Sequence, residues 1–174
     1  AIYDGADAVM LSAESASGQY PREAVAMMDR IITEVERDPY YRSAIDASHA
    51  TPQNNLADAI CTSLRTTAAL VPVAAMVTYT RTGYTSLRAA RERPSAPVVC
   101  ITPLQPIARR LQLAWGLHAV NADEGVSDVA GMIQTACATV KSEGFARSGD
   151  IIVIAAGMPF GSAGTTNLLH IAHV

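Results

Sequence analysis

Lysine is almost missing from this sequence, since Lys141 is the one lysine among 174 residues. It lies in an apparent helix, away from every glycine-rich loop. A reaction that needs a lysine beside a phosphoryl group therefore has no good candidate here. Long apolar runs are also missing, and none approaches the ~20 residues needed to span a bilayer. The first residues lack the basic and apolar pattern of a secretory signal. We therefore expect no membrane partner.

An excess of basic residues is likewise absent. The formal net charge is −3 and the sequence pI is about 5.8, which argues against nucleic acid as a partner. The three cysteines are far apart, without C-x-x-C spacing, and are interpreted as reduced, buried thiols of a cytoplasmic protein: Cys61, Cys100 and Cys137. His170 and His173 have no carboxylate close in sequence to complete a ligand set, so we expect no metal to be bound by this chain.

What the sequence does contain is an alternation of apolar strands and helical repeats. Strands are predicted at residues 74–79, 97–101, 117–120, 150–156 and 167–174. Helical spacing of apolar residues falls between the first four of them. This predicts an α/β fold with a mostly parallel five-stranded sheet and helices on both faces. Because the connector 157–164 is too short for a helix, the last strand is predicted to run antiparallel at an edge, where a second subunit could pair with it.

The N-terminal third is predicted to form a separate βα unit. Residues 6–11 have the composition of a buried strand, and Pro21 opens a helix that continues to Glu36. A polar segment with two prolines, 37–53, is interpreted as a linker, and residues 54–174 as a second domain in which Asn55 caps the first helix. Because the chain opens without Met, in what resembles the tail of a helix, we expect a piece of a longer polypeptide.

The residues that follow the first strand of the second domain suggest an anion site. Hydroxyl groups, a glycine and a guanidinium gather in one turn, provided by Thr80, Arg81, Thr82, Gly83, Tyr84, Thr85 and Ser86. A helix beginning there would direct free N–H groups and the positive end of its dipole at a phosphate. The alternative is that Thr80 or Thr82 merely caps the helix and the rest is an ordinary loop. Both interpretations remain open at this point.

A second candidate loop follows the fourth strand of that domain, GMPFGSAG, residues 157–164. It would act through backbone N–H groups and one hydroxyl, at Gly157, Gly161, Ser162 and Gly164. Ligands of such sheets bind beyond the carboxyl ends of the parallel strands. If the fourth strand lies near the first, both loops could close over one ligand. A plain glycine-rich hairpin connection is the alternative.

Residues 4–25, DGADAVMLSAESASGQYPREAV, closely resemble the end of the catalytic barrel of the pyruvate kinase family. Farther on, Trp115-Gly116, Gly149-Asp150 and GTTNLL at 164–169 fall in the family's order. The resemblance covers essentially the whole chain. It implies that residues 1–36 are the last βα unit of a TIM (β/α)8 barrel and that residues 54–174 are a C-terminal domain for effector binding and oligomerisation, with a homotetramer as the expected assembly.

The family converts phosphoenolpyruvate and ADP to pyruvate and ATP with Mg²⁺ and usually K⁺. The resemblance places the lysine and the acidic metal ligands upstream of Ala1, so the chain alone is expected to be inactive and to bind no metal. Ser12 matches a serine near the substrate and is a candidate proton relay. Glu14 either orients that loop or is purely structural.

The resemblance also implies that the turn from Thr80 to Thr85 and the connector 157–164 hold a sugar-phosphate effector. Tyr84 departs from the small or basic residues often found there. Met158, Pro159 and Phe160 replace effector contacts of some family members. A monophosphate such as AMP or ribose 5-phosphate is therefore favoured over fructose 1,6-bisphosphate. A stand-alone phosphometabolite-binding or oligomerisation module is the alternative, and a domain with a degenerate pocket that serves only assembly is a third.

Overall fold

The computed structural model describes residues 1–47, 51–122, 126–160 and 165–174. The structure divides into two units, Ala1–Ala50 and Thr51–Val174. No helix in the described residues is both long and apolar enough to cross a membrane.

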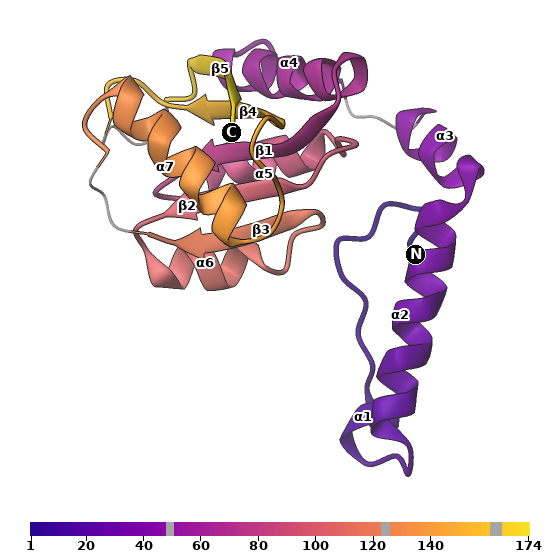
Figure 1. Cartoon of the computed structure of the whole chain (residues 1–174). Coiled ribbons are helices and arrows are strands. Elements are labelled where there is room, and N and C mark those ends of the chain that lie inside the picture. The colour runs from indigo at the N-terminus through magenta and orange to yellow at the C-terminus, as the bar shows by residue number, and fades with distance from the viewer. Residues whose placement is uncertain (48–50, 123–125, 161–164) are drawn as a thin grey trace. The chain divides into compact units, whose positions relative to one another are not determined.

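The second unit is built on one five-stranded sheet (Figure 1). Its strands are β1 (Val73–Tyr79), β2 (Val98–Thr102), β3 (Leu117–Asn121), β4 (Ile151–Ala156) and β5 (Leu168–His173). The strand order is β3-β2-β1-β4-β5, and the first four strands run parallel. β5 pairs antiparallel with β4 at the edge of the sheet. The predicted α/β class, the five mostly parallel strands and the antiparallel last strand are thus confirmed.

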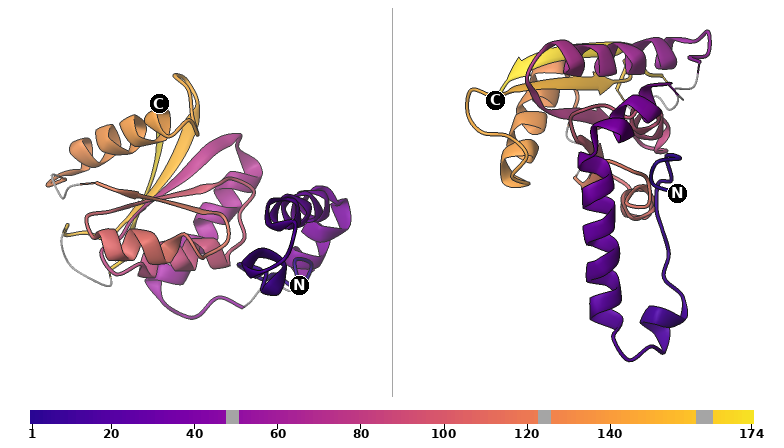
Figure 2. Two further views of the ribbon diagram at one scale, coloured as in Figure 1. Left: turned by 90° about the horizontal axis from the view of Figure 1, so that it is seen from below. Right: turned by 90° about the vertical axis from the view of Figure 1, so that its right-hand side faces the viewer.

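Helices cover both faces of this sheet. α4 (Leu56–Leu70), α5 (Tyr84–Arg91) and α6 (Gln105–Leu111) pack against one face, and α7 (Val129–Ser142) packs against the other. The view from below in Figure 2 shows α6 and α7 on opposite sides of the strands. Each strand serves both faces, because successive side chains point in opposite directions. Met76 of β1 therefore joins the core on the α4 side while its neighbour Val77 joins the core on the α7 side.

Side chains at the helix ends explain where these helices begin and stop. Asn55 caps α4 as predicted, since its Oδ1 accepts from the Asp58 backbone N–H at 2.9 Å. Asp128 caps α7 in the same way through the Gly131 N–H at 2.7 Å. α5 ends at Arg91, and Arg93 lies in the left-handed region with φ 48 directly before Pro94.

The first unit contains the helices α1 (Ala13–Ala16), α2 (Pro21–Arg37) and α3 (Pro39–Ala47). α2 starts at Pro21 as predicted. The predicted strand at residues 6–11 is wrong, because this segment forms no strand in the structure. A strand needs a neighbouring strand to bond its backbone N–H and C=O groups, and the described residues provide none here. α3 lies inside the predicted linker. Pro39 of that segment occupies the first helical position, where proline is tolerated, and Tyr41 and Ile45 are buried on one face of the helix.

Candidate functional site

The carboxyl ends of β1 and β4 lie side by side at the middle of the sheet. β1 pairs in parallel with β4 on one side and with β2 on the other, and β3 lies beyond β2. The chain therefore leaves β1 in one direction and returns to its other side with β4. Such a reversal of strand order is where α/β sheets bind ligands. The condition that we set for two cooperating loops, a fourth strand beside the first, is met.

The turn after β1, residues 80–83, is called the β1 turn here. Its hydroxyl groups are engaged with its own backbone, because Thr80 Oγ1 accepts from the Gly83 N–H at 2.9 Å and Thr82 Oγ1 accepts from the Tyr84 N–H at 3.4 Å. Gly83 has φ 91 and is the residue preceding α5. The N-cap of α5 is Gly83, which has no side chain to cap the helix, so the hydroxyls of Thr80 and Thr82 bond to N–H groups at the place where α5 presents its first donors.

Gly83 is needed for close packing as well as for its backbone angle. A Cβ added there would lie 3.2 Å from Leu111 Cδ2 and 3.4 Å from Arg110 Nη2, both on α6. Any side chain would also be strained at this positive φ. The β1 turn therefore packs directly against α6.

Arg110 brings a guanidinium to the β1 turn that we did not predict from the sequence. Its Nη2 donates to the Thr82 carbonyl at 2.9 Å. Arg81 belongs to the turn itself and is half-buried, whereas Thr82 and Tyr84 are exposed. Two arginines, exposed hydroxyl and phenol groups and the start of a helix are thus gathered at this turn, and together they favour the binding of an anion. No local signal in the sequence links Arg110 to residues 28 positions earlier.

The remaining predicted hydroxyl groups point into the protein. Thr85 Oγ1 lies 2.7 Å from Thr166 Oγ1, and both residues are buried. Ser86 Oγ lies 2.7 Å from Thr78 Oγ1, again in the interior. Thr85 therefore joins α5 to the segment before β5 and is engaged within the protein in this structure. Through this contact the regions that follow β1 and β4 are held together.

The connector after β4 is closed at its base by one asparagine. Asn167 accepts from the Met158 N–H and donates to the Met158 carbonyl, both at 2.8 Å. Gly157 lies so close to the returning chain that a Cβ would be 1.8 Å from the Thr165 carbonyl oxygen. The other predicted residues of this loop, Gly161, Ser162 and Gly164, lie outside the described residues.

Ser12 lies in the first unit, directly before α1. Its backbone N–H donates to Glu14 Oε2 at 3.0 Å. The pKa of the Glu14 carboxyl is lowered by hydrogen bonds from its own backbone and from that of Ser12. Glu14 thus fixes the backbone of the loop that carries Ser12, and the Ser12 side chain is exposed.

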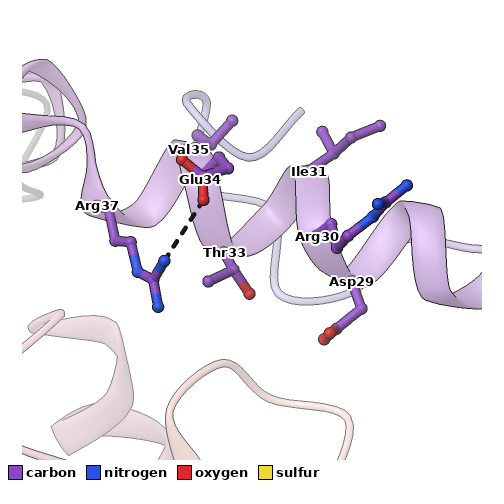
Figure 3. Close-up of a pocket in the computed structure, with 7 residues that line it drawn as sticks. All are labelled: Asp29, Arg30, Ile31, Thr33, Glu34, Val35 and Arg37. Carbon is purple, nitrogen blue, oxygen red and sulfur yellow. Dashed lines mark hydrogen bonds and ion pairs between the residues drawn. The ribbon is translucent and has the colours of Figure 1, made fainter.

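A hollow of about 570 Å³ runs along α2 (Figure 3). The side chains that line it come from this one helix, and Arg37 is paired with Glu34 across 3.4 Å. Its lining residues are Asp29, Arg30, Ile31, Thr33, Glu34, Val35 and Arg37. None of the predicted site residues borders it, so we assign it no function.

The described residues contain no group of three His, Cys, Asp or Glu side chains that could hold a metal ion. The cysteines carry free thiols, and Cys61 and Cys100 are buried as predicted, while Cys137 is half-buried. Burial raises the pKa of Cys61 to about 12 and that of Cys100 to about 11, so neither is a nucleophile near neutral pH.

Together these features define a doubly wound α/β domain with a candidate anion-binding turn at its switch point. A sequence model of the family described as "Pyruvate kinase, alpha/beta domain" matches residues 58–172. The chain belongs to the pyruvate kinase family.

Relatives extend this similarity to the whole chain. A pyruvate kinase of Methylorubrum extorquens is 43% identical over 174 residues, which is 100% of this chain and 36% of the relative. The pyruvate kinases of Clostridium acetobutylicum and Geobacillus stearothermophilus are 38% and 39% identical over 98% of this chain, and over 36% and 29% of their own lengths. The chain thus spans about a third of the length of these relatives.

Proposed function

We propose that this chain is the C-terminal portion of a cytoplasmic, glycolytic pyruvate kinase and that it carries effector binding and subunit assembly. The full protein would convert phosphoenolpyruvate and ADP to pyruvate and ATP. The pairing of β1 with β4, which brings their carboxyl-end loops together, is the observation that supports an effector site most strongly. Membership of the family supports the reaction of the full protein.

The proposed effector is a sugar monophosphate or a nucleoside monophosphate. Its phosphate would accept from the N–H groups of Gly83 and Tyr84 once the hydroxyls of Thr80 and Thr82 release them, with Arg81 nearby as a permanent positive charge. Charge-assisted hydrogen bonds of this kind are about twice as strong as neutral ones. Thr85 would support the site from behind through its bond to Thr166, and the connector at Gly157 would border it.

Calorimetric titration tests this site. Ribose 5-phosphate, AMP and fructose 1,6-bisphosphate are titrated into the chain and into Arg81→Ala at one ionic strength. We expect saturable heats for the monophosphates and a loss of about tenfold in affinity in the variant, since a hydrogen bond to a charged group contributes about 1.5–3 kcal/mol. Identical weak heats for both proteins would rule out the site.

We further propose that residues 1–36 are the last βα unit of a catalytic barrel, with Ser12 as a proton relay. Mg²⁺ and K⁺ would serve the full enzyme. We expect the purified chain to be inactive, and Mg²⁺-dependent formation of pyruvate from phosphoenolpyruvate and ADP would refute this.

Assembly into a homo-oligomer, a homotetramer in the full enzyme, is proposed to use the outer edge of β5. The Val174 N–H donates inward to the Asp150 carbonyl, so strand alternation turns the N–H of Ile171 outward. Ile171 itself is 49% exposed. Ile171→Pro removes that outward donor and keeps the β4 ladder intact. Native mass spectrometry should show an oligomer for the parent chain and a monomer for the variant. A monomeric parent chain would contradict assembly through this edge.

The alternative is a phosphometabolite-binding or oligomerisation module without kinase activity. The kinase hypothesis and the module hypothesis differ in what the gene encodes upstream of Ala1. A reading frame that continues through a barrel with a catalytic lysine and acidic metal ligands supports the kinase, and one without them supports the module.

A further inference from the structure

A fully buried carboxylate, Asp58, collects three donors in the first turn of α4. Asp58 is 0% exposed. It accepts from the Arg88 guanidinium, from Arg91 Nη2 at 2.8 Å and from the Gln53 backbone N–H at 2.6 Å. A buried charge is costly unless it is paired and hydrogen-bonded. The start of α4, the helix α5 and the chain at Gln53 are therefore fastened to one carboxylate.

A second buried acid balances the other arginine. Glu92 is also 0% exposed, and its Oε1 lies 3.3 Å from Arg91 Nη2. Its Oε2 accepts from the Thr62 hydroxyl at 3.3 Å. Arg91 is thus shared between the two acids. Arg88, which bonds to Asp58, also contacts Tyr84 and Gln53.

Arg88 contacts the start of α5 on one side and the start of the second unit on the other. Its guanidinium carbon lies 4.5 Å from the centre of the Tyr84 ring, within cation–π range. Its Nη2 donates to Gln53 Oε1 at 3.2 Å. Tyr84 is the first residue of α5, and Gln53 follows closely after Thr51, where the second unit begins. One largely buried guanidinium thus bridges these two places.

The β1 turn would have to rearrange to bind a phosphate. In this structure the N–H groups of Gly83 and Tyr84 are donated to the hydroxyls of Thr80 and Thr82. A phosphate that accepts from these N–H groups must displace the hydroxyls. Tyr84 carries both one of these N–H groups and the ring that the Arg88 guanidinium contacts, so the β1 turn and Arg88 meet at one residue.

We propose that Arg88 is a positioning residue that transmits the state of the β1 turn to the chain at Gln53, next to the boundary between the two units. This inference rests on the proposed effector site. A ligand shifts a conformational equilibrium only through different contacts in the two states. In this proposal the contact that differs between the two states is the one made by the Tyr84 N–H. Arg88 links that residue to Gln53, because its guanidinium contacts the Tyr84 ring and bonds to Asp58 and to the Gln53 side chain.

Amide hydrogen exchange at Gln53 tests this coupling, because the Gln53 N–H is bonded within the network. Exchange is measured by NMR on the whole chain, without ligand and with saturating ribose 5-phosphate or AMP. Arg88→Lys keeps the charge but loses the planar stacking and the forked donors. Tyr84→Leu removes the ring under the guanidinium, and Arg109→Lys, on an exposed residue of α6, is the matched control.

We expect ligand to change the exchange rate of Gln53 by about fivefold in the parent chain and in Arg109→Lys, a typical size for coupling between sites. Arg88→Lys should bind the same ligand about as tightly, and neither Arg88→Lys nor Tyr84→Leu should show the change at Gln53. An equal change in all proteins, or no change in the parent chain despite binding, overturns the coupling and leaves the effector site standing. Failure of both ligands to bind the parent chain overturns the site and the coupling together.

Discussion

The two units bury their apolar residues very differently. In the second unit, Leu64 and Met76 are 0% exposed within a core formed by helices and strands. In the first unit, Met10 is 86% and Ile31 55% exposed, and α2 has no buried residue in the described structure. The same kind of apolar pattern thus forms a core in one unit and remains largely exposed or only partly buried along α2 in the other.

This difference shows what an amphipathic pattern can and cannot specify. Val25, Met28, Ile32 and Val35 give α2 a regular apolar stripe, which is enough to predict a helix. Burial of that stripe requires a neighbouring layer. The second unit supplies such layers from its own sequence, whereas in the first unit Val25 is exposed and Met28, Ile32 and Val35 are only partly buried.

The largest expected effect is on the core of the second unit. Leu64→Ala should lower the free energy of unfolding by about 3 kcal/mol, because it leaves a cavity at a fully buried site. Ile31→Ala, the matched truncation in the first unit, should cost less than about 0.5 kcal/mol. Urea unfolding followed by circular dichroism and by the fluorescence of Trp115, the single tryptophan, measures both. Equal losses would remove the contrast between the units.

A smaller effect should come from the close approach at Gly157. Gly157→Ala places a methyl group where the Thr165 carbonyl already lies, and we expect a loss of about 2 kcal/mol from overpacking. Gly131→Ala in α7 meets only Asp128 Oδ1 at 3.4 Å and should stabilise the helix by up to about 1 kcal/mol. Changes of opposite sign in the free energy of unfolding, measured with urea, would confirm the prediction. A Gly157→Ala variant with unchanged stability would contradict it.

The buried hydroxyl pair joining α5 to the segment before β5 should have a smaller effect still. Thr85→Val and Thr166→Val should each cost about 1 kcal/mol, because each leaves one buried hydroxyl without its partner. The double variant should cost less than the sum of the two. A double-mutant cycle measured by urea unfolding tests this, and strict additivity would mean that the two hydroxyls do not interact.

The smallest expected effect concerns an exposed contact of the first unit. The Tyr3 hydroxyl donates to Asp38 and lowers the pKa of that carboxyl, helped by the Tyr40 N–H. A carboxyl with a lowered folded-state pKa contributes stability at neutral pH that is lost as the pH falls through the folded pKa. The Asp38 pKa, measured by carbon NMR of the carboxyl, should rise in Tyr3→Phe. A pKa that does not change would show that the contact is not formed in solution.

The strands and helices of the second unit could be predicted from local pattern. Apolar runs and helical spacing indicated each strand and helix, and the short connector before β5 indicated the antiparallel edge. The strand at residues 6–11 was predicted wrongly because a strand depends on partners that a local pattern does not include. α3 was missed because a proline at a first helical position resembles a helix breaker.

The candidate site was predictable only in part, because its contacts join residues far apart in the chain. The β1 turn followed from local composition, whereas Arg110 reaches it across 28 positions and Thr85 meets Thr166 across 81. Asn55 was predicted as the cap of α4, but the pairing of Asp58 with Arg88 depends on how α4 and α5 pack. Hydroxyl groups predicted to face a ligand are engaged within the protein for the same reason.

The central claim is that the β1 turn binds a phosphate. A nitrogen–proton NMR titration of the chain with ribose 5-phosphate at constant ionic strength tests it most directly. We predict saturable shifts that are largest at the Gly83 and Tyr84 amides, extend to Thr166 and weaken about tenfold in Arg81→Ala. Shifts that do not saturate, that scatter over exposed arginines such as Arg109 or that persist unchanged in Arg81→Ala would contradict the claim.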